Sequence, residues 1–262
     1  MPRLAANLTM LFGEVDFLDR FEAAARAGFR GVEFLFPYGY DAEVLKAQLC
    51  DHRLVQVLHN LPAGDWGAGE RGIACLPDRV DEFKAGVAQA IRYAAALDCD
   101  RVNCLAGKLP GGADPSAARE TFVRNLAYAA PLLKSAGITL LIEPINTRDL
   151  PGFFLSGTPQ ALEIIEAVGS DNLWLQYDIY HMQIMEGDVA PAIERLLPHI
   201  AHIQLADVPG RHEPGTGDID FGALLAHIDR VGYTGWIGCE YVPAAATAAG
   251  LAWAAPYLSR VR

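Results

Sequence analysis

The chain has no run of lysine and arginine, and its 32 acidic residues outnumber its 21 basic ones, which gives a net charge of −11 over 262 residues. Proteins that bind nucleic acid neutralise many phosphates with basic side chains. This composition therefore disfavours extended nucleic-acid binding. It leaves a small molecule as the expected partner.

Long apolar runs and paired cysteines are missing as well. Although 52% of the residues are hydrophobic, no uninterrupted apolar stretch approaches the ~20 residues that a membrane span needs. The first residues, MPRLAANLTMLFGEVDF, turn polar too early for a secretory signal, so we expect a cytoplasmic protein with no membrane partner. The five cysteines are odd in number and have no CxxC spacing, which argues against both a disulfide framework and a zinc ribbon.

The fingerprint GxGxxG is absent after the first apolar run, which disfavours an open doubly wound sheet. The chain instead alternates strand and helix patterns, and several helical segments close on Gly28, Gly137, Gly169 or Gly232. Strands are predicted at 3–8, 30–36, 54–60, 101–106, 138–143, 173–178, 200–206 and 236–241. Eight such units predict a (β/α)8 TIM barrel of the α/β class, a single domain over residues 1–262.

A glycine-rich segment, LPAGDWGAGERG at 61–72, follows the third predicted strand. It is not followed by a phosphate-loop lysine, and no helix begins immediately after it, so a phosphate-binding loop is not expected. We interpret it as a long flexible loop and a candidate lid over the barrel mouth.

Four oxygen-bearing side chains lie at or near the ends of the last four predicted strands: Glu143, Asp178, Gln204 and Glu240. Barrel enzymes take their catalytic residues from these strand ends. Three carboxylates and an amide suit Mg²⁺ or Mn²⁺, and a divalent cation would offset the repulsion between the carboxylates. Any one of them alone could equally be a helix cap or an ion-pair partner. Glu33, on the second strand, is either support for the site or an ordinary hydrogen-bonding group.

Further polar residues are candidates for substrate binding. His181 follows the sixth strand and Arg211 the seventh, where an imidazole and a guanidinium can hold an oxygen-rich anion. His59 and Asn60 end the third strand and Lys108 follows the fourth, so all three are candidates to line the mouth. His202 shares a strand face with the glutamine two residues later and is an alternative metal ligand.

Six linked motifs resemble the hydroxypyruvate isomerase family, within the xylose-isomerase-like barrel superfamily and close to the 2-oxo-tetronate isomerases. They are VEFLFPY, LPAGDWGAGERGI, LLIEPINTRDLPGFFL, LQYDIYHMQIMEGD, HIQLADVPGRHEPGTGDID and GWIGCEY. The resemblance implies a divalent metal held by Glu143, Asp178, Gln204 and Glu240, with the two glutamates also serving as the acid/base pair. His181 and Arg211 match substrate-binding residues of related sugar epimerases, which carry a histidine where this chain has Gln204.

The resemblance implies an isomerase that interconverts hydroxypyruvate and 2-hydroxy-3-oxopropanoate (tartronate semialdehyde) by metal-assisted proton transfer through an enediolate. This would place the chain in carbohydrate and glyoxylate metabolism. A 2-oxo-tetronate isomerase and a sugar epimerase of the same superfamily are the alternatives. A DNA-repair endonuclease on a related barrel is disfavoured by the acidic charge and the few histidines, and a catalytically silent sugar-acid-binding protein by the retained glutamates. The sequence leaves the oligomeric state, including a homo-oligomer, open.

Overall fold

The strands of this protein close into a parallel barrel. The structure is a computed structural model that describes residues 1–258. Each strand pairs in parallel with the next one along the chain, and the last pairs with the first. The strands are Arg3–Asn7 (β1), Gly31–Glu33 (β2), Val55–Asn60 (β3), Arg101–Cys104 (β4), Thr139–Ile142 (β5), Leu173–Asp178 (β6), Ile200–Leu205 (β7) and Trp236–Cys239 (β8). The predicted fold class is confirmed; the part of the predicted domain at 259–262 lies outside the described residues.

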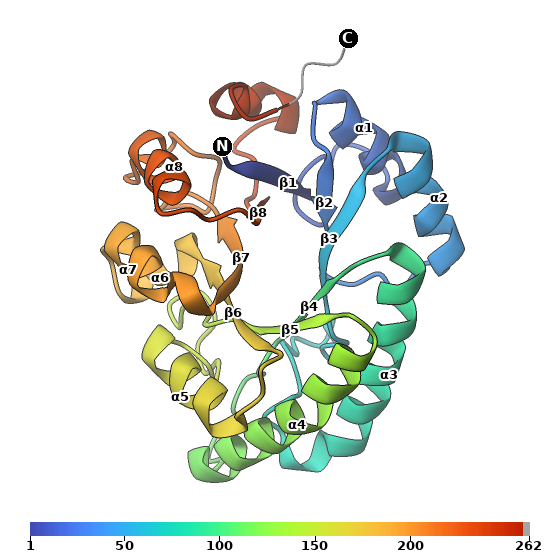
Figure 1. Cartoon of the computed structure of the whole chain (residues 1–262), viewed down its shortest axis with the longest axis vertical. Helices are drawn as coiled ribbons and strands as arrows, with labels where there is room; N and C mark the ends of the chain where they lie inside the picture. Colours follow the sequence, from blue (N-terminus) through green and yellow to red (C-terminus); the bar gives the residue numbers. More distant parts are fainter. Residues whose placement is uncertain (259–262) are drawn as a thin grey trace.

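An outer ring of helices surrounds the barrel (Figure 1). The helices are Arg20–Arg26 (α1), Ala42–His52 (α2), Val80–Leu97 (α3), Pro115–Ser135 (α4), Thr158–Val168 (α5), Ile179–Met185 (α6), Val189–Leu196 (α7) and Phe221–Arg230 (α8). Short 3-10 helices occupy Phe17–Asp19, Pro77–Arg79, Leu197–His199 and Thr247–Ala254. The last of these fills the ring between α8 and α1 (Figure 1). Within residues 1–258, no helix combines the length and the apolar character needed to cross a bilayer.

The helix ends follow their sequence signals. α5 ends at Gly169, whose φ of 64° lies in the left-handed region that glycine adopts without strain. At the other end of a helix, Asp41 and Asp114 begin α2 and α4 by accepting hydrogen bonds from backbone N–H groups of the first turn. These local signals are the reason that the alternation of elements was readable from the sequence.

The interior of the barrel changes from apolar to polar along the strands. At the amino ends, Ala5 and Leu141 pack with the side chains of Trp174 and other residues in a small cluster separate from the main core. Along β6, alternate side chains point the same way, so Trp174 is followed by Gln176 and then Asp178. Both of these polar residues are buried. Burying polar groups is costly unless they are paired, so this gradient directs the search for a site to the carboxyl ends.

Candidate active site

A buried hydrogen-bond network crosses the upper interior of the barrel, and Glu33 is its centre. The Glu33 carboxylate accepts from Asn7 Nδ2 at 3.0 Å and from Gln204 Nε2 at 2.7 Å, and it lies 2.8 Å from His202 Nε2. Asn7 Nδ2 also donates to Glu240 Oε2 at 3.0 Å. The network therefore joins β1, β2, β7 and the end of β8. Glu33 therefore supports the site by holding Asn7 and Gln204. His202 is paired with Glu33 in the barrel interior, below the strand ends.

Three side chains converge at the barrel mouth. Glu143, Asp178 and His181 each offer a ligand atom, and these atoms lie within 4.8 Å of one another. Within residues 1–258 they form the one group of three or more His, Cys, Asp or Glu ligand atoms close enough to share a cation. Glu143 Oε2 accepts from Asn103 Nδ2 at 2.9 Å. Asp178 Oδ1 accepts from the backbone N–H of Tyr180 at 2.8 Å, which begins α6 and aims the second carboxylate oxygen at the mouth.

Arg211 links the second half of the site. Its Nη2 donates to Glu240 Oε1 at 2.7 Å and lies 3.5 Å from Asp178 Oδ2. The guanidinium lies over the ring of Tyr180, 5.1 Å from its centroid. Glu240 is thus held on one oxygen by Arg211 and on the other by Asn7 and Gln204. The four strand-end residues predicted from the sequence lie at the same end of the barrel.

A buried aspartate shapes the loop that carries Arg211. The Asp207 carboxylate accepts hydrogen bonds from the backbone N–H groups of Val208, Gly215, Gly217 and Ile219. The chain must pass close to itself here, since a Cβ on Gly217 would lie 2.2 Å from the carbonyl oxygen of Val208. The Asp207 carboxylate therefore holds both ends of the segment 208–219 together. This fixes the position of the backbone from which the Arg211 side chain extends to the mouth.

Replacing Asp207 with asparagine should destabilise the protein and disturb the site together. The amide presents a donor to backbone donors, so at least one buried N–H group loses its partner, at a cost of about 1–3 kcal/mol. For a domain of this size each kcal/mol lowers the melting temperature by roughly 2–4 °C. Thermal unfolding would measure this effect, with Asp218→Asn, at an exposed position in the same loop, as the control. Equal melting temperatures for the two variants would contradict this role of Asp207.

Burial controls the protonation of the site. It raises the pKa of Glu143 well above its usual range, and the charges of Glu240 and Asp178 raise it further. Burial likewise raises the pKa of Glu240 to about 8, although Arg211 acts in the opposite direction. The pKa of Asp178 is also raised by burial. For His181, burial and then the charge of Arg211 hold the pKa well below the usual value. Without a cation, burial therefore favours the protonated form of these carboxyl groups and the neutral form of the imidazole.

The hydrogen bonds around His181 determine which ring nitrogen carries the proton. The backbone N–H of Asp149 donates to Asn146 Oδ1 at 2.8 Å, which leaves Asn146 Nδ2 facing His181 Nδ1 at 2.7 Å. Because Nδ2 is a donor, Nδ1 of the neutral ring must accept, and the proton is on Nε2. Nε2 lies 3.5 Å from Asp178 Oδ2. His181 therefore presents a hydrogen-bond donor to the mouth.

A cavity of about 230 Å³ opens at this mouth. It is smaller than the roughly 300–1,000 Å³ of pockets that hold drug-sized ligands, so it suits a ligand of few atoms. Its walls are Met10, Leu35, Asn60, Trp66, Arg71, Leu105, Glu143, Ile145, Asp149, Leu150, His181, Arg211 and Glu240. Glu143 and Glu240 thus border one common space. The loop predicted as a lid contributes Trp66 and Arg71 to the wall.

Two residues predicted to line the mouth lie elsewhere. His59 is buried with its ring 6.1 Å from that of Tyr38, while the next residue, Asn60, borders the cavity. Burial lowers the pKa of His59 to about 4. Lys108 pairs through its backbone with Phe153 and is not among the lining residues. Neither His59 nor Lys108 has a role in the proposal below.

Several residues at the mouth were missed by reasoning from the sequence. Asn103 and Asn146 hold Glu143 and His181, but a single asparagine near a strand end carries no distinctive signal. Arg71 lies within the glycine-rich segment 61–72, which was singled out as a whole and not for this side chain. A search for basic residues in loops that follow strands would have found it.

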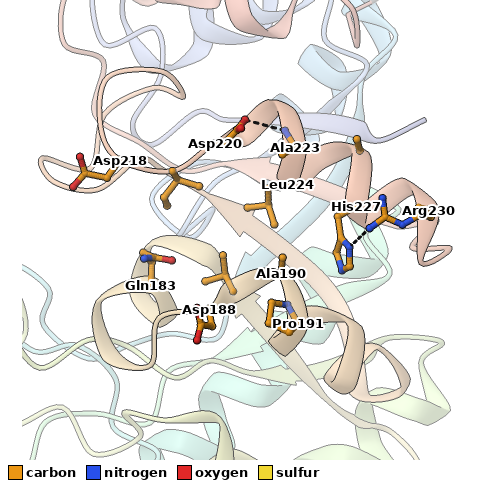
Figure 2. A pocket seen from close by; sticks show the side chains of 13 residues that line it. Gln183, Asp188, Ala190, Pro191, Asp218, Asp220, Ala223, Leu224, His227 and Arg230 are labelled. Atoms are coloured by element: carbon orange, nitrogen blue, oxygen red, sulfur yellow. Dashed lines mark hydrogen bonds between the residues drawn. The ribbon is translucent and has the colours of Figure 1, made fainter.

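A second and larger groove, of about 640 Å³, lies on the outer surface between α7 and α8 (Figure 2). Asp220 there accepts from the backbone of Ala223 at 2.9 Å, and His227 Nδ1 is 2.6 Å from Arg230 Nη2. Asp220 thus begins α8, and His227 Nε2 also lies 3.5 Å from Glu194 Oε2 of α7, so these polar groups serve the two helices themselves. The candidate active site is therefore the smaller cavity at the barrel mouth, because the carboxylates converge there.

The fold and this arrangement of carboxylates are those of a barrel enzyme, and the chain belongs to the xylose isomerase-like TIM barrel family, whose model matches residues 21–257. It is 56% identical to the hydroxypyruvate isomerase of Escherichia coli strain K12, over 98% of this chain and 100% of that one. It is 50% identical to the 2-oxo-tetronate isomerase of Cupriavidus necator, over 99% and 100%. These full-length relatives confirm the predicted class of enzyme, an isomerase.

Solved structures share the same barrel. A protein from Brucella melitensis described as AP endonuclease, family 2, superposes with a TM-score of 0.96 at 48% identity, over 99% of this chain and 100% of that one. The 3-keto-D-glucoside 4-epimerase of E. coli superposes with a TM-score of 0.81 at 20% identity, over 98% and 99%. At that identity the second likeness shows the fold alone.

Proposed function

We propose that this chain interconverts hydroxypyruvate and 2-hydroxy-3-oxopropanoate, with Glu143 and Glu240 as the acid/base pair. The observation that carries the proposal is that these two buried glutamates border one small cavity and that both have a raised pKa. A carboxyl group whose pKa lies near the working pH can both accept and return a proton. Full-length identity to isomerases of short keto acids supports this choice of substrate.

The reaction moves two hydrogens and leaves the carbon skeleton intact. One glutamate removes a proton from C3 of hydroxypyruvate, next to the C2 ketone, while the C2 oxygen gains a proton, which gives the enediol or its anion. A proton is then delivered to C2 and the C3 hydroxyl loses its proton, so that C3 becomes the aldehyde. Asn103 holds Glu143 for this transfer, and Asn7 holds Glu240.

His181 and Arg211 are the proposed ligands for the substrate oxygens beside the reacting carbons. The proton on His181 Nε2 is a neutral donor to an oxygen that gains negative charge, and burial keeps the ring neutral. Arg211 also positions Glu240 through its 2.7 Å contact. Donors of this kind stabilise the developing charge without reorganising during the reaction.

The residues that we propose as ligands of a divalent cation, Mg²⁺ or Mn²⁺, are Glu143, Asp178, Gln204 and Glu240. The donor set fits, because Asp178 Oδ2 is buried without a hydrogen-bond donor among the described residues and Asp178 and Glu143 offer ligand atoms that lie within 4.8 Å of each other. When bound, the cation would supply an electrophile that stabilises negative charge on the substrate oxygens. The proton on Nε2 of His181 favours a donor role for that residue over metal ligation.

Gln204 fits this set after one rotation of its amide. Its Nε2 donates to Glu33 and Glu240, and its Oε1 accepts from Gln176 Nε2 at 2.6 Å. The oxygen of Gln176 is buried and has no hydrogen-bond partner in the described part of the chain, residues 1–258. Turning both amides over would keep a hydrogen bond between them and direct the Gln204 oxygen toward the carboxylates. A bound cation is what would make that orientation favourable.

Direct assay tests the substrate. Purified protein with Mg²⁺ or Mn²⁺ should convert hydroxypyruvate, with deuterium from solvent entering at C2 of the aldehyde product as measured by NMR. A four-carbon 2-oxo-tetronate, assayed in parallel, carries one more hydroxymethyl group. A group of that size typically changes kcat/KM by roughly tenfold or more in one direction, and we expect the three-carbon acid to be preferred. Preference for the larger acid would reassign the substrate, and no conversion of either would refute the proposal.

The DNA-repair alternative makes a different prediction for the same protein. A gel-shift with a duplex that contains an abasic site should show no binding, because the net charge of −11 opposes contact with phosphates. A cytoplasmic location stays a prediction from the sequence, which leaves the oligomeric state open.

A further inference from the structure

Two arginines border the cavity, and they differ in what their charges face. Arg211 donates to Glu240 at 2.7 Å and lies 3.5 Å from Asp178 Oδ2, so protein carboxylates match its charge. Arg71 donates through Nη1 to the backbone carbonyl oxygens of Trp66, at 3.1 Å, and Glu70, at 2.7 Å. Within residues 1–258, Arg71 forms no ion pair with a carboxylate, and its Nε and Nη2 have no recorded protein acceptor.

We propose that Arg71 binds the carboxylate of the substrate and makes this site specific for keto acids over neutral sugars. The inference rests on the proposed function and deepens it, since it assigns the end of the substrate that does not react. A guanidinium binds a carboxylate through two parallel N–H donors, and Nε with Nη2 is one of the edges that can do so. Nη1, which is already engaged with the loop backbone, is not needed for this contact.

The loop holds Arg71 in place before any ligand arrives. The guanidinium stacks on the ring of Trp66, with Arg71 Cζ 4.0 Å from the ring centroid. That ring in turn packs on Phe36, with 5.0 Å between the ring centroids. Glu70, the neighbour that would otherwise neutralise Arg71, is bound instead by Arg79, whose Nη1 donates to Glu70 Oε1 at 2.6 Å. A side chain already fixed by stacking and by backbone contacts loses little further entropy when it binds a ligand.

The backbone of the loop is also fixed against the next strand. Gly72 has a φ of 106°, and a Cβ at this position would lie 2.3 Å from the carbonyl oxygen of Leu105. Cys75 N donates to Ala106 O at 2.8 Å. The segment just after β4 therefore supports the arginine-bearing loop, and both Arg71 and Leu105 border the cavity.

The charges around the cavity set the direction in which a keto acid would bind. The acidic residues of its wall are Glu143, Asp149 and Glu240. A substrate carboxylate would be repelled by these groups and attracted to the unmatched Arg71. With C1 at Arg71, the C2 and C3 atoms are left for the glutamates. A neutral sugar offers the guanidinium only uncharged hydroxyl acceptors, which compensate for the desolvation of its charge less well than a carboxylate does.

The test compares an acid with its neutral counterpart in Arg71→Met, Arg71→Lys and wild-type protein, all loaded with Mn²⁺. Arg92→Gln is the control, because Arg92 is exposed on α3 and bonds only to a carbonyl of its own helix. Hydroxypyruvate and dihydroxyacetone differ by a carboxylate in place of a hydroxymethyl group, and deuterium uptake reports turnover of each. D-Glycerate, which cannot isomerise, serves as a calorimetric probe of acid binding.

Arg71→Met should lower kcat/KM for hydroxypyruvate roughly 10- to 100-fold, mainly through KM, which is what losing a charged hydrogen-bond partner implies. The affinity of Arg71→Met for D-glycerate should fall by a similar factor, and both values for Arg71→Lys should be intermediate. The rate of Arg71→Met with dihydroxyacetone should equal that of the wild type. The control variant Arg92→Gln should match the wild type in every measurement. Unaltered D-glycerate binding in Arg71→Met, absent binding in the wild type, or an equal loss for acid and neutral compound would overturn the role of Arg71. A wild type that binds D-glycerate through Arg71 but leaves hydroxypyruvate unchanged would refute the proposed function and keep the acid-binding role.

If Arg71→Met does not fold, which its melting temperature would show, Arg71→Lys carries the test. It keeps the charge and the aliphatic stem over Trp66 but not the two-pronged donor. A weaker affinity for D-glycerate at an unchanged melting temperature supports the proposal. Wild-type affinity would contradict the two-donor contact on which the proposal depends.

Discussion

Glu143→Gln and Glu240→Gln should each lose isomerisation of hydroxypyruvate, with kcat lowered by about 10²–10⁴-fold, the usual contribution of a single acid/base group. Glutamine keeps the shape of the side chain and one acceptor oxygen but cannot take up or return a proton. Both glutamates are buried and border the same cavity, so solvent cannot replace either one easily. Conversion and deuterium uptake, followed by NMR at saturating Mn²⁺, would measure the loss.

The Glu143→Gln and Glu240→Gln variants should lose different steps of the reaction. Whichever variant still exchanges the C3 hydrogen of hydroxypyruvate without forming the aldehyde has kept the group that acts at C3, which assigns the two roles. Glu163→Gln is the matched control, because Glu163 is exposed on α5. Wild-type turnover in either active-site variant would remove that glutamate from the mechanism.

Removal of divalent cations should abolish turnover, and their return should both restore it and raise the melting temperature. A ligand at 100 times its Kd stabilises a fold by about 2.7 kcal/mol, and each kcal/mol corresponds to roughly 2–4 °C in a domain of this size. We therefore expect an increase of roughly 5–10 °C on adding Mn²⁺ to chelator-treated protein. Asp178→Asn, which removes a proposed ligand, should lose most of this response.

The thermal response should also depend on pH in a defined direction. In the folded chain the pKa of Glu240 is about 8, and that of Glu143 is raised well above its ordinary value of 4.5. Between pH 4.5 and about 8 the metal-free folded chain therefore binds more protons than the unfolded chain, so its free energy of unfolding falls as the pH rises. A cation must displace these protons, so it binds more tightly at higher pH.

The increase in melting temperature caused by Mn²⁺ should accordingly be larger at pH 8 than at pH 6. Differential scanning calorimetry of chelator-treated and reloaded protein at both values would measure it. Full activity after exhaustive chelation, together with no thermal response at either pH, would rule out the proposed metal site.

The sequence predicted the eight strands and the end of the barrel at which the site lies. Short apolar runs, separated by amphipathic segments of which several close on glycine, are local signals, and eight such runs are enough to close a barrel. The strand-end position of Glu143 and Glu240 follows directly, because parallel strands in a closed barrel all end on the same side. No knowledge of side-chain packing was needed for this step.

Side-chain direction was less predictable, and His59 illustrates the reason. Successive residues of a strand point to opposite faces, so an error of one residue in register exchanges interior and exterior. Asn60 borders the cavity while His59 packs near Tyr38. Lys108 was placed by its position after a strand, and the path of a loop does not follow from periodicity.

What the sequence alone determined is a barrel with acidic and amide side chains at one end, since the order of local patterns dictates both. Only the tertiary structure decided how those side chains are paired: Arg211 with Glu240, Glu33 with Gln204, and Arg71 with no carboxylate of residues 1–258. These pairings join residues far apart in the chain, and their geometry depends on the packing of every strand between them. Charge at the mouth is therefore a property of the sequence, whereas the availability of that charge for a ligand is a property of the fold.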